Sequence, residues 1–306
     1  MNDADLHQFY LNFVARLRGK GVLCAITSGL ACVHFGVAET TKDCDLLCHP
    51  GSFAVLLDEL AKTHVNGLAC RYRGNLSPPL DERWHRGGWT SHFTWGQGPG
   101  AVTFDVFGQA LRASTPWQNE LSGLYASPHI VAEMKRTNRD KDWPFITALG
   151  TRLIEMGDER GWLHIFDEEI LKELLREYSC PPAIASLRPA LMLANSADQR
   201  LKISLLAERL FWEQLDALRI RIYERALRPY NTAVRKAMMP DTASLSEEHE
   251  IRLRCALDHL APSPLHDYGI GRLIEEAKHA AVVESGLVPE AAQMLPDVTV
   301  NFSFIS

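Results

Sequence analysis

Three aspartates have the residue type and spacing best suited to metal chemistry. Asp43 and Asp45 flank Cys44 in a segment that alternates polar and apolar residues, and Asp105 lies in a second such segment. Alternation with a period of two is typical of a strand, so Asp43 and Asp45 should point to the same face. Carboxylates on one face suit Mg²⁺, which binds a few of them together with substrate phosphates and water. We therefore predict a metal site formed by Asp43, Asp45 and Asp105.

A serine and a glycine upstream of these carboxylates could supply backbone donors. Ser28 and Gly29 follow the apolar run 22–27 and precede a second apolar stretch, 30–35. This pattern predicts a strand, a tight turn and a short helix. The N–H groups of such a turn can bind phosphate oxygens. Together with the carboxylates, they indicate a site in which metals hold the attacking and leaving oxygens of an in-line displacement.

The elements that must position these residues divide the chain into an α+β half and a helical half. Helical spacing marks 3–19 and 52–62, and alternation marks a further strand at 102–108. The segment 73–100 has no clear period, which predicts a long loop or two weak strands with an insert. Helical patterns then follow at 128–138, 142–156, 162–178, 197–228, 246–260 and 268–285, with a capping box at Ser244 and Glu247.

We therefore expect an α+β fold with a mixed sheet and flanking helices, followed by a helical domain. The expected boundary separates a domain of residues 1–155 from a helical domain of residues 156–306, because glycines at 157 and 161 interrupt the pattern.

Composition and charge narrow the class of protein. The chain has 46% hydrophobic and 23% charged residues, as in ordinary globular proteins, and its net charge of -6 provides no general attraction to nucleic acid or anionic lipid. Seven scattered cysteines do not form a disulfide framework, and the first residues lack the plan of a signal peptide. No apolar run is long enough to span a membrane. We expect a cytoplasmic protein with no membrane association.

The pattern of these residues resembles the DNA polymerase β-like nucleotidyltransferase superfamily. Its signature is a Gly-[Gly/Ser] pair, a short segment, Asp-x-[Asp/Glu], and a later aspartate on a strand. Here Ser28-Gly29 is followed by thirteen residues, then Asp43-Cys44-Asp45, and later Asp105. The resemblance covers residues 22–150 and is greatest to the bacterial branch that includes the AbiEii-type toxins and minimal nucleotidyltransferases. An arginine usual before the Asp-x-Asp motif is replaced by the segment 39–42.

The resemblance implies a nucleotidyltransferase fold and an enzyme that transfers a nucleoside monophosphate from an NTP to a hydroxyl acceptor. It implies two Mg²⁺ ions held by the three aspartates, and an acceptor that is RNA (tRNA included), a protein or a small molecule. It also implies that the protein could be the toxin of a toxin-antitoxin pair, with an antitoxin protein as partner. The nucleotide-binding residues that it implies are Ser28, Gly29, Thr41, Lys135 and Asp142.

Two other functions remain open at this point. The same fold could bind nucleotide or act as a scaffold without catalysis, because fold does not fix function. The enzyme could also modify an antibiotic, with a small molecule as the acceptor.

Several residues have two interpretations each. Asp142 could support Lys135, or it could cap the helix that starts at residues 143–144. The aromatic and basic segment 83–92 could stack on a nucleobase, or it could be a lid packed on the sheet edge. The arginines of the long helix could face RNA or solvent, with Arg219, Arg221 and Arg225 as the candidate phosphate contacts.

Overall fold

The computed structural model describes residues 3–237 and 242–303, and its sheet is mixed, which confirms the α+β class. Eight strands lie in the order β3-β4-β5-β6-β2-β1-β8-β7, in which β2 and β6 are parallel and β1 and β2 are antiparallel. The strands are β1 (Cys24–Thr27), β2 (Asp43–Cys48), β3 (His64–Val65), β4 (Leu68–Tyr72), β5 (Thr90–Trp95), β6 (Val102–Phe107), β7 (Leu121–Ser122) and β8 (Tyr125–Ala126).

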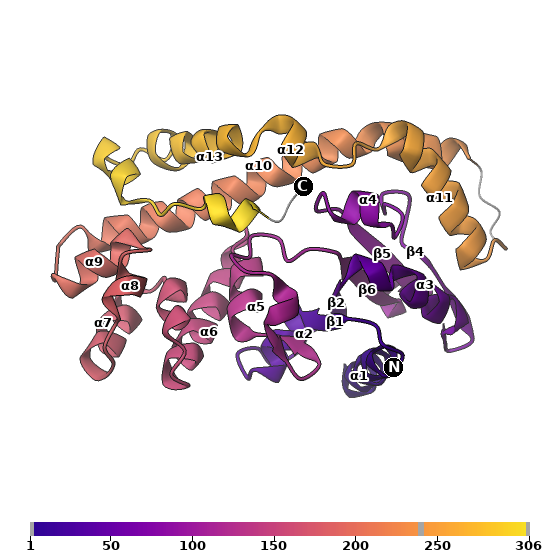
Figure 1. Ribbon diagram of the computed structural model, residues 1–306, viewed down its shortest axis with the longest axis horizontal. Coiled ribbons are helices and arrows are strands. Elements are labelled where there is room, and N and C mark those ends of the chain that lie inside the picture. The colour runs from indigo at the N-terminus through magenta and orange to yellow at the C-terminus, as the bar shows by residue number, and fades with distance from the viewer. Residues whose placement is uncertain (1–2, 238–241, 304–306) are drawn as a thin grey trace.

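Helices precede, interrupt and follow the sheet (Figure 1). Those of the first half are α1 (Asp3–Gly19), α2 (Ser28–His34), α3 (Phe53–Lys62), α4 (Glu82–His85), α5 (Pro128–Met134) and α6 (Trp143–Glu155). Those of the second half are α7 (Glu168–Glu177), α8 (Pro182–Ala185), α9 (Pro189–Asn195), α10 (Leu201–Lys236), α11 (Leu245–His259), α12 (Pro264–Tyr268) and α13 (Ile270–His279).

Helix α1 covers one face of the central strands. Its Tyr10 and Phe13 rings lie 6.5 Å and 5.4 Å from the ring of Phe104 on β6, and Phe13 also meets Trp95 on β5. The Tyr10 hydroxyl donates to the carbonyl oxygen of Thr103 in β6 at 2.7 Å, and it lies 3.1 Å from the carbonyl oxygen of Lys42, just before β2. Residues of the opposite face, Asp105 among them, are therefore left to other elements.

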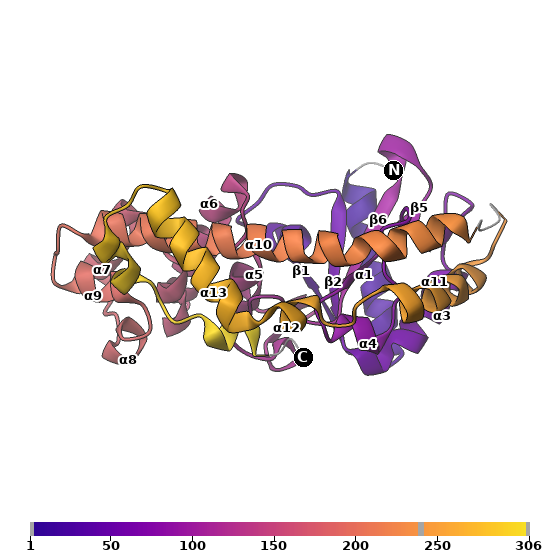
Figure 2. The same cartoon turned by 90° about the horizontal axis from the view of Figure 1, so that it is seen from above.

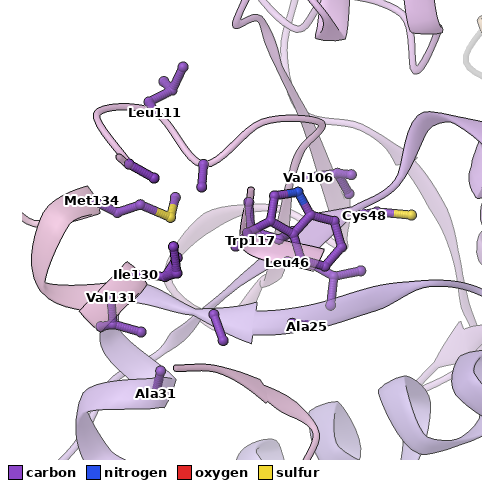
Figure 3. Packing of buried hydrophobic residues seen from close by; sticks show 14 of the residues in the cluster. Ala25, Ala31, Leu46, Cys48, Val106, Leu111, Trp117, Ile130, Val131 and Met134 are labelled. Atoms are coloured by element: carbon purple, nitrogen blue, oxygen red, sulfur yellow. The ribbon is translucent and has the colours of Figure 1, made fainter. Parts of the chain in front are cut away.

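Helices α2 and α5 enclose the sheet on the side of β1. Figure 3 shows Ile130, Val131 and Met134 of α5 beside Ala31 of α2, around the strand that carries Ala25. The Thr27 hydroxyl at the end of β1 reaches the Met134 sulfur at 3.4 Å. This packing sets the position of the turn between β1 and α2.

The 36-residue helix α10 runs along most of the molecule, with α11, α12 and α13 beside it (Figures 1 and 2). Its pattern predicted an end near residue 228, but the helix continues through Pro229. Tyr230 and Val234 are buried beyond the proline, and the Tyr230 hydroxyl donates to the Ser77 carbonyl at 2.8 Å. Tertiary packing of the last turns therefore outweighs the local cost of proline.

Other boundaries also differ from the sequence pattern. The expected helix over 162–178 is broken, because Asp167 accepts hydrogen bonds from the N–H groups of Glu169 and Ile170 and starts α7 afresh. The expected helix over 268–285 starts only at Ile270, after Gly269, which has a φ of 95°. The capping box of Ser244 and Glu247 is confirmed at the start of α11.

The core includes residues from both halves of the described chain. One continuous cluster of buried apolar side chains includes residues from Leu6 to Phe302, and a smaller one lies between Ile154 and Leu205. The expected domain boundary at residues 155 and 156 falls at the end of α6. It stays a prediction.

Candidate functional site

Strand register brings the predicted aspartates together. Asp45 on β2 is the direct partner of Asp105 on β6, and Asp105 is the direct partner of His92 on β5. Asp43, two residues before Asp45, is paired with Thr103, whose hydroxyl donates to the Asp43 carboxylate. Residues in register and residues two apart share one face of a sheet. The predicted common face of the three carboxylates is therefore confirmed.

The carboxyl group of Asp45 has a raised pKa. Burial, followed by the like charge of Asp105, raises the pKa of Asp45 to about 6, while a hydrogen bond from the Ser28 side chain opposes the rise. The charge of Lys135 also lowers this pKa. Two carboxylates side by side repel each other when both are ionised, and a cation between them removes that repulsion. This pair is thus a local centre of negative charge.

The turn between β1 and α2 has an unusual backbone. Ser28 has a φ of 55°, in the left-handed region that favours glycine, and its side chain points to Asp45. A Cβ at Gly29 would lie 2.6 Å from the Thr41 hydroxyl oxygen, so a larger residue there would require Thr41 to shift. The turn is therefore close to both the loop before β2 and the carboxylate of Asp45.

The predicted pair of Lys135 and Asp142 is also present. Lys135 follows α5, its Nζ lies 3.0 Å from the Asp142 carboxylate, and both side chains are buried. Burial opposes ionisation of Asp142 most strongly, but Lys135, the Thr137 hydroxyl and Arg139 together hold its pKa below the ordinary value. Asp142 occupies the N-cap position of α6 without a capping hydrogen bond. The helix-cap interpretation of its side chain is therefore wrong.

Arg73 is a residue of this face that the sequence reasoning did not single out. It directly follows β4, and its Nη2 lies 2.8 Å and 2.9 Å from the two carboxylate oxygens of Asp105. The same nitrogen lies 3.1 Å from Nδ1 of His92, which is 3.0 Å from Asp105. A signal was available, because Arg71 and Arg73 alternate with Cys70 and Tyr72 as on a half-buried strand.

Two hollows flank this group. A groove of about 1060 Å³ is lined by β4, β5 and the start of α11, and includes Arg71, Arg73 and Thr103. A cleft of about 180 Å³ lies between residues 76–92 and α10, and includes His92 and Arg219. The groove thus adjoins the carboxylates at Thr103 and Arg73, and the cleft adjoins them at His92.

The segment 83–92 does not offer free tryptophan rings. Trp84 and Trp89 are buried, and their indole N–H groups donate to the carbonyl oxygens of Leu260 and Ala261. The burial of both rings agrees with the interpretation of a packed lid. The prediction that these two rings stack on a nucleobase is therefore wrong.

The arginines of α10 do not form one strip. Arg219 donates to the buried Asp216 and lines the small cleft, whereas Arg221 and Arg225 lie near Glu276 and Tyr268. Residues two apart on a helix point in nearly opposite directions, which explains the division. A single phosphate-binding surface made of all three arginines is therefore wrong.

The donor set can be tested against Mg²⁺. In the described part of the chain, no three His, Cys, Asp or Glu side chains already converge as a metal site. Asp45 and Asp105 nevertheless provide hard oxygen donors in register, and burial together with the neighbouring Asp105 carboxylate raises the pKa of Asp45. The residues fit a divalent cation, provided that Arg73 leaves the Asp105 oxygens.

Comparisons of the chain with protein-family models, curated proteins and solved structures find no significant match. Among the described helices, none is both long and apolar enough to cross a membrane.

Proposed function

We propose that this protein is a Mg²⁺-dependent nucleotidyltransferase. The observation that carries the proposal is the pairing of Asp45 with Asp105 across adjacent parallel strands, with Asp43 two residues away on the same face. Next to this pair lies a turn that begins with Ser28 in the left-handed region. Carboxylates beside a backbone turn suit a triphosphate with its metal ions.

Each residue has a distinct task in the proposed reaction. Asp43, Asp45 and Asp105 would hold the Mg²⁺ ions, which when bound neutralise charge on the phosphates. The N–H groups of the Ser28-Gly29 turn would bind outer phosphate oxygens.

The proposed reaction exchanges one phosphorus–oxygen bond for another. The acceptor hydroxyl oxygen forms a bond to the α-phosphorus, the bond from that phosphorus to the bridging oxygen breaks, and pyrophosphate leaves. Asp105 would accept the hydroxyl proton, since it faces the groove-lining side of β6. Lys135, which pairs with Asp142, would bind and orient the triphosphate. Its charge already acts on Asp45, where the triphosphate would lie.

The test is to follow the label from NTPs labelled at either the α- or the γ-phosphate. Each NTP is incubated with the protein, Mg²⁺ and either total cellular RNA, total protein or a panel of aminoglycosides. We expect label to transfer from the α-phosphate and not from the γ-phosphate, with loss of transfer in Asp45→Asn and retention in the surface variant Asp58→Asn. Transfer from the γ-phosphate, or equal transfer by Asp45→Asn, would overturn the proposal.

One observation favours the alternative of nucleotide binding without transfer. Arg73 contacts both oxygens of Asp105. In a protein of this fold without catalysis, the Arg73 guanidinium would take the place of the metal permanently. NTP binding that is retained in Mg²⁺-free buffer, without label transfer to any acceptor pool, would favour this alternative.

A further inference from the structure

Arg73 occupies the position beside Asp105 that a cation would take. Its Nη2 lies within 2.9 Å of both carboxylate oxygens, so the bidentate approach to Asp105 is already filled. A guanidinium stays protonated throughout the physiological pH range. Arg73 therefore balances the charge of Asp105 while no metal is bound, and a divalent cation that approaches both oxygens must displace it.

The surroundings of Arg73 leave room for this displacement. Its side chain is 38% exposed and lines the groove of about 1060 Å³, and the loop that starts at Gly74 follows directly. Arg252, by contrast, lines the same groove but is buried and donates to the carbonyl oxygens of Gly74 and Ser77. The backbone of Arg73 is held by its N–H bond to the His92 carbonyl, so the side chain can turn without movement of the sheet.

The groove that would receive the guanidinium is suited to an anion. The partly exposed charged side chains that line it are Arg71 and Arg73, and the carboxylate of Glu248 among its lining residues is buried and paired with Arg252. Thr103, which donates to Asp43, also lines the groove. An anionic group bound there would thus lie next to the carboxylate face.

We propose that Arg73 and the divalent cation compete for Asp105, and that metal binding releases the Arg73 guanidinium into the groove, where it binds a phosphate group of the substrate. This inference rests on the proposed function, because it needs a metal site at Asp45 and Asp105. Arg73 would then couple metal binding to anion binding. The same side chain would block Asp105 before the metal binds and would bind the phosphate after the metal has bound.

The experiment measures binding of Mn²⁺ alone to the full chain by electron paramagnetic resonance. The variants are Arg73→Gln, which removes the charge, and Arg73→Lys, which keeps it with a single-point donor. Arg71→Gln is the matched control, since Arg71 lines the same groove and lies 3.6 Å from Glu248. We expect Arg73→Gln to bind Mn²⁺ about three- to tenfold more tightly than the wild type, Arg73→Lys to lie between, and Arg71→Gln to match the wild type.

A second measurement follows inorganic pyrophosphate by calorimetry at saturating Mn²⁺. Arg73→Gln should bind pyrophosphate about tenfold more weakly than the wild type, because it lacks the released guanidinium. Circular dichroism establishes that each variant is folded, and Arg73→Lys provides the comparison if the glutamine variant is not.

The outcomes distinguish a failure of the proposed competition from a failure of the proposed function. Equal Mn²⁺ affinity in the wild type and Arg73→Gln, with loss of Mn²⁺ in Asp45→Asn, overturns the competition and leaves the proposed metal site intact. Weaker Mn²⁺ binding in Arg73→Gln overturns the competition as well. No Mn²⁺ binding by any of these proteins overturns the proposed function together with the inference.

Discussion

At the scale of single residues, Asp45 is held in a state that costs folding free energy. Its pKa of about 6 lies above the ordinary value of a carboxyl group, so the folded protein binds a proton there more tightly than the unfolded chain does. The cost of the ionised carboxylate is absent below about pH 4 and is fully present above about pH 6. Such strain is common where a charged ligand is to be bound.

Asp45→Asn should therefore stabilise the metal-free protein at pH 8 while it abolishes nucleotidyl transfer. We expect a gain of about 1–2 kcal/mol, which disappears as the pH falls from 6 towards 4. Denaturant unfolding at pH 8 and pH 4.5 measures it, with Asp58→Asn as the control, since Asp58 pairs with Lys62 at the exposed surface. A variant that is less stable than the wild type at pH 8 contradicts this view of Asp45.

Ser28 offers a second test at the same scale. Its φ of 55° costs a residue with a Cβ about 1 kcal/mol, and its side chain lowers the pKa of Asp45. Ser28→Gly removes both effects. It should stabilise the chain by about 1 kcal/mol and move the acidic limb of the pH–rate profile to higher pH, because the carboxylate loses a hydrogen bond. An unchanged acidic limb would mean that the Ser28 hydroxyl does not act on Asp45.

At the scale of elements, the turn between β1 and α2 depends on the close approach of Thr41 to Gly29. A methyl group at Gly29 would lie 2.6 Å from the Thr41 hydroxyl oxygen and would push the loop before β2 away from the turn. Gly29→Ala should cost about 1–3 kcal/mol and raise the KM for NTP. Gly271→Ala is the matched control, because a Cβ there meets nothing within 4 Å. Thermal melts and initial rates provide the readouts.

The elements that carry the aspartates were predictable from the sequence, since strict alternation at β2 and β6 and the Ser28-Gly29 turn are local signals. The register that pairs Asp45 with Asp105 agrees with the prediction, because the expected metal site requires a third carboxylate on a neighbouring strand. The contact of Arg73 with Asp105 was not predicted. The alternation of residues 70–73 indicates a half-buried strand, but only the pairing of β4 with β5 and of β5 with β6 brings Arg73 to Asp105.

The interpretation of the aromatic and basic segment failed for a different physical reason. Trp84 and Trp89 have the composition of a stacking surface, but the chain after α11 packs over them and accepts both indole N–H groups. Burial by a segment more than 170 residues away leaves no local pattern in the sequence. Asp142 differs, because its partners are local: its side chain binds Lys135 and Thr137 rather than capping α6, and the pairing with Lys135 was one of the two interpretations of its sequence position.

At the scale of the whole molecule, a buried ion network joins α10 to the region that contains the sheet. Asp216 on α10 accepts from Arg112, which follows β6, from Arg219, and from the backbone N–H of Asn138. Although burial opposes ionisation of Asp216, Arg112 and Arg219 hold its pKa below the ordinary value. The long helix is thus fixed to the elements that bound the carboxylate face.

Asp216→Asn should destabilise the protein by about 3 kcal/mol, since it leaves the buried Arg112 guanidinium without a counter-charge. Glu224→Gln, on the exposed surface of α10, should change the stability by less than about 0.5 kcal/mol. Urea unfolding of both variants measures the difference. A small effect in Asp216→Asn would mean that the network contributes little to the attachment of α10.

The most direct test of the central claim is a crystal structure with Mn²⁺ and an NTP analogue whose α–β bridge resists cleavage. We predict anomalous density within about 2 Å of oxygens of both Asp45 and Asp105, with the triphosphate against the turn of Ser28 and Gly29. Anomalous density elsewhere, or a nucleotide bound away from this face while Arg73 still contacts Asp105, would contradict the account.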